Sequence, residues 1–123
     1  MSDSCLFLIK DNTTPVCHEV ALYMHWNGKN AIELLELSID EMRRNDAPMS
    51  LARLTGVVTR YFSKTNLSVA CFSINPNELC DFFGYDAGIL LYDCFSGLLK
   101  ISKGYLKDDH RNNTVLKTPP LDY

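Results

Sequence analysis

The stretch Tyr23-Met24-His25-Trp26-Asn27-Gly28 marks the corner where an apolar, strand-like run gives way to the start of a helix. It contains the single tryptophan of the chain and one of its three histidines. Asn-Gly is turn chemistry, and tryptophan combines a large apolar surface with an N–H that needs a partner. The corner is therefore either a binding site or a staple between the sheet and its first helix. We expect the staple, with Trp26 packed over the edge of the core.

Two apolar runs come before the helix. Cys5 to Ile9 is nearly continuous and ends in the turn residues that precede Pro15, whereas Val16 to His25 alternates in parity. Runs of this length, separated by a Thr-Pro turn, predict an antiparallel hairpin.

The first helix is marked by its start and by its periodicity. Asn30 has the features of an N-cap, with Glu33 three residues later as in a capping box. We expect the helix to run from Ala31 to Arg44, burying a stripe at helical spacing formed by Ile32, Leu35, Ile39 and Met42.

A second helix begins at Ala47-Pro48, because proline is tolerated in a first turn. Gly56 lies in the middle of this helix and predicts close packing on a neighbour. The expected buried stripe consists of Leu51, Leu54, Val57 or Val58, and Tyr61.

The rest of the chain predicts three further strands and a tail. Leu67 to Ile74 is a strand, and residues 75–82 form a short helical turn. Ala87 to Asp93 and Leu98 to Ser102 flank a hairpin turn in which Gly97 takes a positive φ. From Lys103 the sequence becomes polar.

The element order β-β-α-α-β-short α-β-β predicts an α+β fold of two layers, with a mainly antiparallel sheet and two helices on one face. We expect one domain over residues 1–102, followed by a polar C-terminal tail over residues 103–123. The second face of the sheet is expected to be partly open.

Composition and net charge limit the classes of protein to which this chain can belong. The chain has 123 residues, is 46% hydrophobic and carries a formal net charge of −3, which gives no general attraction to nucleic acid. The five cysteines are odd in number and form no CxxC, which favours reduced, buried thiols. Because there is no signal peptide and no long apolar stretch, we expect a cytoplasmic protein without membrane contact.

Five pieces of the sequence resemble a group of small, largely uncharacterised phage and prophage proteins. The most specific is Leu22 to Gly28 with its aromatic-x-His-Trp-x-Gly corner; the others are the amphipathic helix that follows it, Ser50 to Leu54, Leu67 to Phe72 and Asp86 to Asp93. The resemblance covers roughly Val20 to Ile101. It implies an origin in a mobile element and a protein that binds host machinery, including as an anti-CRISPR inhibitor. It implies no catalytic residues.

Catalysis would require a nucleophile or base with partners. His25 with Asp86 or Cys71 can be drawn from residue types alone, since the ends of their strands could meet. Cys71 lies between apolar neighbours, where a thiol is more often buried and inert. No histidine cluster has metal-ligand spacing, so we expect neither a metal nor another cofactor.

Charged residues on the two helices are the other candidates. Arg53, Arg60 and Lys64 share one face of the second helix, where they could track phosphates or simply be solvated. The first helix carries an exposed acidic band that could imitate nucleic acid or meet a basic groove on a host protein: Glu33, Glu36, Asp40 and Glu41.

These observations predict a non-enzymatic interaction protein that inhibits a host defence complex such as CRISPR-Cas in the cytoplasm of the host cell, as a monomer or homodimer. The alternatives are a small hydrolase or transferase that uses His25 with Asp86 or Cys71, and a nucleic-acid-binding accessory protein. The residues expected to contact the partner are Trp26, His25, Glu33, Glu36, Asp40, Arg53 and Arg60.

Overall fold

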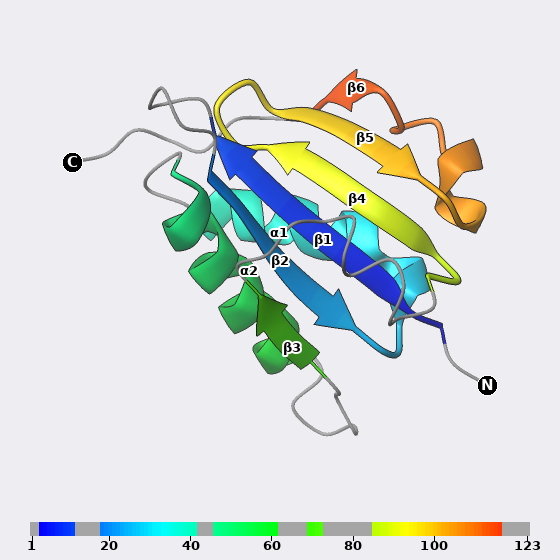
Figure 1. The fold of residues 1–123 in the computed structure, drawn as a ribbon, viewed down its shortest axis with the longest axis horizontal. Coiled ribbons are helices and arrows are strands. Elements are labelled where there is room, and N and C mark those ends of the chain that lie inside the picture. The colour runs from blue at the N-terminus through cyan, green and yellow to red at the C-terminus, as the bar shows by residue number, and fades with distance from the viewer. Residues whose placement is uncertain (1–2, 12–17, 42–45, 62–68, 73–84, 117–123) are drawn as a thin grey trace.

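The computed structural model describes residues 3–11, 18–41, 46–61, 69–72 and 85–116. They form one six-stranded sheet with both α-helices on one face (Figure 1), which is the two-layer α+β fold that the sequence predicts. In chain order the elements are β1 (Cys5–Asp11), β2 (His18–Met24), the short 3-10 helix η1 (Gly28–Asn30), α1 (Ala31–Glu41), α2 (Ala47–Tyr61), β3 (Val69–Phe72), β4 (Gly88–Asp93), β5 (Leu98–Ser102), the 3-10 helix η2 (Tyr105–Asp108) and β6 (Thr114–Val115).

The sheet is built around β1. The strand order is β3-β2-β1-β4-β5-β6, and every pairing is antiparallel except that of β1 with β4. The predicted hairpin is confirmed, with Cys5 opposite Met24. Because β1 lies at the centre and is buried on both faces, its sequence is almost continuously apolar instead of alternating.

The main core lies between the sheet and the helices. Phe7 and Ile9 of β1 point into it, and so does Leu22 of β2. The stripe predicted for α1 is confirmed over the described residues, with Ile32 and Ile39 fully buried.

α2 differs from its predicted packing at two positions. Tyr61 is 60% exposed, because it ends the helix beside a surface hollow shared with Leu37 and Arg60. The close approach predicted at Gly56 is also wrong for the described residues, since a methyl group placed there would meet none of their atoms within 4 Å. Gly56 lies two residues from both Leu54 and Val58, which are buried, and therefore faces the other way.

The start of α1 also differs from the predicted N-cap at Asn30. Asn27 adopts a left-handed backbone with φ 67°, and the single turn η1 leads into the helix. The N–H of Asn30 donates to Asn27 O at 3.0 Å, while Glu33 accepts a hydrogen bond from Arg111. The capping box of Asn30 with Glu33 is therefore not formed.

The second face of the sheet is closed in one half and hollowed in the other. Leu6, Leu8 and Tyr23 are buried where the face crosses β1 and β2. Over β4 and β5 a hollow of about 420 Å³ remains, with Leu91 and Lys100 in its wall.

The predicted boundary at Lys103 is wrong, because the sheet domain continues to Leu116. β6 pairs with β5, and both Leu106 and Leu116 are buried in the main core. Each of these two leucines follows a single other apolar residue, Tyr105 or Val115, in an otherwise polar stretch, so the sequence shows no periodicity there. The predicted short helix at 75–82 and residues 117–123 lie outside the described residues.

Candidate functional site

The corner at Tyr23 to Gly28 is fastened by a residue that sequence reasoning missed, Asp3. Its backbone N–H donates to His25 O, and its carbonyl accepts from the N–H of Gly28 at 2.7 Å. Its carboxylate accepts from the N–H of Lys29 at 3.0 Å. A methyl group on Gly28 would lie 2.6 Å from the Ala87 Cβ, so glycine is required for this close approach.

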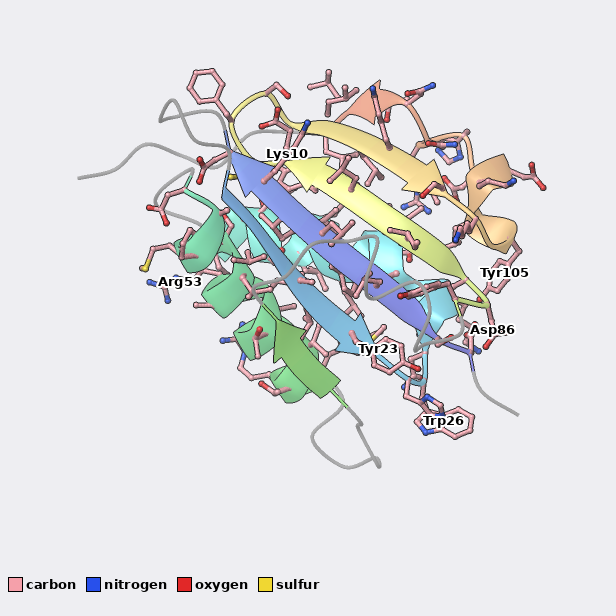
Figure 2. All side chains as sticks on the ribbon, viewed as in Figure 1. Lys10, Tyr23, Trp26, Arg53, Asp86 and Tyr105 are labelled. Atoms are coloured by element: carbon pink, nitrogen blue, oxygen red, sulfur yellow. The ribbon has the colours of Figure 1, made fainter. Side chains whose placement is uncertain are left out.

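Trp26 is not the plug that the sequence predicts. Its side chain is half-buried, outside both apolar clusters, and it points away from the sheet beyond Tyr23 (Figure 2). The His25 ring packs against it edge to face at 4.8 Å, and His25 Nδ1 lies 2.7 Å from the Tyr23 hydroxyl. The corner therefore leaves an aromatic pair at the surface while backbone bonds hold it together.

His25 and Asp86 lie at the same end of the sheet, but the hydrogen bonds among the described residues give them different partners and do not join them as an acid–base pair. The Asp86 carboxylate accepts from the hydroxyl of Ser4 at 3.2 Å, and Ser4 is fully buried. His25 is oriented by Tyr23 instead. The side chain of Cys71 lies outside the described residues. The Ser4–Asp86 hydrogen bond joins the start of β1 to the segment before β4, and the Ser4 hydroxyl belongs to a fully buried residue.

The basic face of α2 is divided. Arg53 is exposed and projects away from the helix (Figure 2). Arg60 is bound to Glu41 at the end of α1, with its Nη2 2.6 Å from Glu41 Oε1, and Lys64 lies outside the described residues. Of the two described arginines on this face, Arg60 is therefore paired within the chain, which reduces what it can offer to phosphates.

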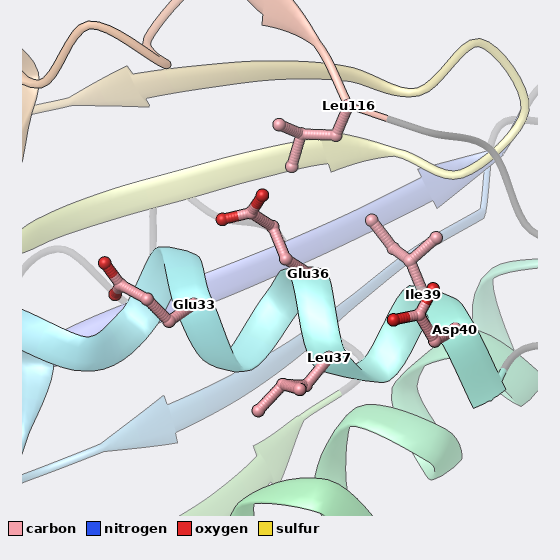
Figure 3. A pocket seen from close by; sticks show the side chains of 6 residues that line it. All are labelled: Glu33, Glu36, Leu37, Ile39, Asp40 and Leu116. Carbon is pink, nitrogen blue, oxygen red and sulfur yellow. The ribbon is translucent and has the colours of Figure 1, made fainter.

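The acidic residues predicted on the first helix do come together. Glu33, Glu36 and Asp40 line a hollow of about 480 Å³ on the outer surface of α1, which we call the α1 groove (Figure 3). Its apolar lining consists of Leu37, Ile39 and Leu116. The volume lies in the range of ligand pockets, and a mixed apolar and charged lining is typical of contact surfaces.

Leu37 is the unusual member of the α1 groove. A large aliphatic side chain on the outer face of a helix, 46% exposed, loses the benefit of burial unless something covers it. Figure 3 shows it on the opposite flank of α1 from Glu36 and Ile39, which reach toward Leu116. The groove therefore spans the width of the helix.

Arg111 binds two of the acidic side chains that line the α1 groove. Its Nη1 donates to Glu36 Oε1 at 2.7 Å, and its Nη2 donates to Glu33 Oε1 at 3.0 Å. Asp109 binds the same guanidinium from behind, with Oδ1 2.9 Å from Nε. These bonds to Arg111 lower the pKa of Asp109 to about 2, and Asp109 in turn raises the pKa of Arg111. Three carboxylates thus share one cation, and the cluster remains acidic.

Sequence reasoning found the glutamates of this groove and missed its other parts. Leu37 could have been found, because it follows Glu33 by four residues and so shares the solvent face of the helix. Arg111 and Leu116 gave no signal, since the polar stretch around them shows no pattern that predicts contact with α1.

Within the described residues, no three His, Cys, Asp or Glu side chains gather as a metal site would require. The helices in that part of the chain are also too short or too polar to cross a bilayer. No protein-family model, curated protein or solved structure matches the chain.

Proposed function

We propose that this chain acts by binding another protein, without catalysis, and that the α1 groove is the contact surface. The observation that carries the proposal is Leu37, a large apolar side chain that is 46% exposed and lines the same hollow as the acidic side chains of Glu33, Glu36 and Asp40. An apolar anchor surrounded by charges is the usual anatomy of a binding hot spot.

The charges of the rim define the partner's chemistry. Glu33 and Glu36 are about half exposed, and with Asp40 they give the groove a negative border. The complementary surface is a segment with an apolar side chain flanked by arginine or lysine. Opposite charges of this kind favour encounter and exclude acidic competitors.

The partner to test first is the one that the resemblance to phage proteins implies, a host defence complex such as CRISPR-Cas. Such complexes carry basic surfaces that follow nucleic-acid backbones. A small acidic protein with an apolar anchor has the chemistry to cover a surface of that kind. On this proposal, the chain works in the cytoplasm of the host.

The test uses purified CRISPR-Cas effector complexes and three forms of the protein: wild type, Leu37→Asp and Asp108→Asn. Asp108 is an exposed carboxylate that does not line the groove, so its variant is a control for a one-unit change of surface charge outside the groove. We expect one complex to bind wild type and lose nuclease activity. Leu37→Asp should weaken binding by more than 2 kcal/mol, which is about thirtyfold, whereas Asp108→Asn should change it little.

Two results would count against the proposal in different ways. If no complex binds wild type and phage plating is unaffected by its expression, the proposed partner class is wrong. If a complex binds wild type and Leu37→Asp equally well, and both variants melt normally, the contact surface lies elsewhere. Trp26→Ala is then the next variant, because a tryptophan at the surface is a common anchor and Trp26 is only half-buried.

A further inference from the structure

We infer that Arg111 is the positioning residue of the α1 groove, and that it holds Glu33 and Glu36 ready for a cation of the partner while remaining in place itself. The inference rests on the proposed function. It goes further by assigning a role to a positive residue at the edge of a site for a positive partner, where simple electrostatics would expect it to reduce binding.

The first observation is how Arg111 is anchored. Asp109 accepts hydrogen bonds from the backbone N–H, Nε and Nη2 of Arg111, each between 2.9 and 3.0 Å. The loop around it is tied to β5, where Asn112 Oδ1 accepts from the N–H of Ile101 at 2.7 Å and the N–H of Asn113 donates to Leu99 O. The guanidinium is therefore fixed by its own loop before it meets α1.

The second observation is which carboxylate oxygens of Glu33 and Glu36 bind Arg111. Each gives Arg111 one oxygen, Oε1. For these two side chains, no bond to Oε2 occurs within the part of the chain that the structure describes. Arg111 thus fixes the direction of each carboxylate and leaves a second acceptor on each for another donor.

The third observation is burial. The Arg111 side chain is 22% exposed, against 54% for Glu33 and 46% for Glu36. A partner approaching the groove meets the glutamates first and the arginine behind them. Glutamate side chains lose much rotamer freedom when they are held, and Arg111 imposes that loss before the partner arrives. The site is consequently preorganised for a guanidinium or ammonium group beside an apolar side chain.

Arg111→Gln separates this inference from simple electrostatics. The variant makes the groove more negative, so charge alone predicts tighter binding of a basic ligand, whereas loss of positioning predicts weaker binding. The probe is a synthetic amphipathic peptide of leucine and arginine, and binding is followed by titration calorimetry and by the methyl NMR signals of Leu37 and Leu116. We expect Arg111→Gln to bind the peptide about five- to tenfold more weakly than wild type.

Arg111→Lys tests the fork geometry, because it keeps the charge but cannot bond both glutamates in the same plane. We expect intermediate binding. The Leu116 methyl signals show whether β6 stays docked in each variant. Binding by Arg111→Gln that equals or exceeds that of wild type would overturn the inference while leaving the α1 groove as the contact surface.

A measurement on wild type needs no variant. The Arg111 Nε–H signal should persist, with slow solvent exchange, when the peptide is bound. Its loss would mean that the peptide's arginine replaces Arg111, which would also overturn the inference. A peptide that shifts neither leucine methyl in wild type would refute the proposed function itself, and the role of Arg111 with it.

Discussion

Gly56→Ala should stabilise the protein. Gly56 lies inside α2, where glycine costs about 1 kcal/mol relative to alanine because the unfolded chain has more freedom to lose. The new methyl group would meet no atom within 4 Å in the part of the chain that the structure describes, so no steric penalty from there offsets this gain. Gly56 is also absent from the glycines with positive φ among the described residues, so alanine fits its backbone. We expect the free energy of unfolding to rise by about 0.8 kcal/mol and Tm by roughly 3 °C.

The assay is urea unfolding followed by far-ultraviolet circular dichroism. The midpoint should rise while the slope with urea concentration stays constant, since the variant exposes the same surface on unfolding. Gly28→Ala is the matched control: its methyl group would lie 2.6 Å from the Ala87 Cβ and 2.7 Å from Asp3 O. That variant should lose about 1–3 kcal/mol. A Gly56→Ala protein no more stable than wild type would refute the reasoning and place an unseen neighbour against this face of α2.

Asp11→Ala should lower the free energy of unfolding by about 2 kcal/mol, because the buried Asp11 carboxylate accepts a hydrogen bond from the Ala47 N–H at 2.6 Å where α2 begins. Urea unfolding measures this loss, and an unchanged midpoint would contradict the prediction. Asp109 gives a pH dependence: its folded pKa of about 2 lies below the ordinary 3.8, so its stabilisation is complete above about pH 4 and is lost as pH falls through 2. Between pH 5 and pH 2, the free energy of unfolding should therefore fall less for Asp109→Asn than for wild type, as urea unfolding at each pH can measure. Burial raises the pKa of the Cys94 thiol to about 12, so iodoacetamide at pH 7 should leave it unmodified in the folded protein, as peptide mass spectrometry can show; rapid labelling would mean that this part of the core opens readily.

The sequence was most informative where patterns are local. The parity of β2, the stripe of α1 and the positive φ of Gly97, 82° in the structure, all follow from the preferences of neighbouring residues. For the same reason the acidic band was predicted correctly as one exposed face. Leu37 obeys the same helical spacing, one turn after Glu33, but a single leucine in a helix that also buries Leu34 and Leu35 gives no separate signal of exposure.

The rest depends on contacts between distant residues. Arg111 reaches glutamates more than seventy positions away, and Asp3 fastens a corner more than twenty positions away. No periodicity connects such pairs. Gly56 shows the opposite error. A glycine within a helix predicts close packing only if a neighbour lies against it, and none of the described residues lies within 4 Å of a methyl group at Gly56.

The central place of β1 has a consequence for how the chain folds during synthesis. Cys5 pairs with Gly88 and Lys10 with Asp93, so the first strand made waits for more than eighty further residues before its second neighbour exists. The β1–β2 hairpin can form early, but one long apolar edge of it stays without a partner in the meantime. Contacts of such long range slow folding and expose nascent chains to aggregation. We therefore expect C-terminal truncations that remove β4 to leave an insoluble product, whatever helical structure has formed before them.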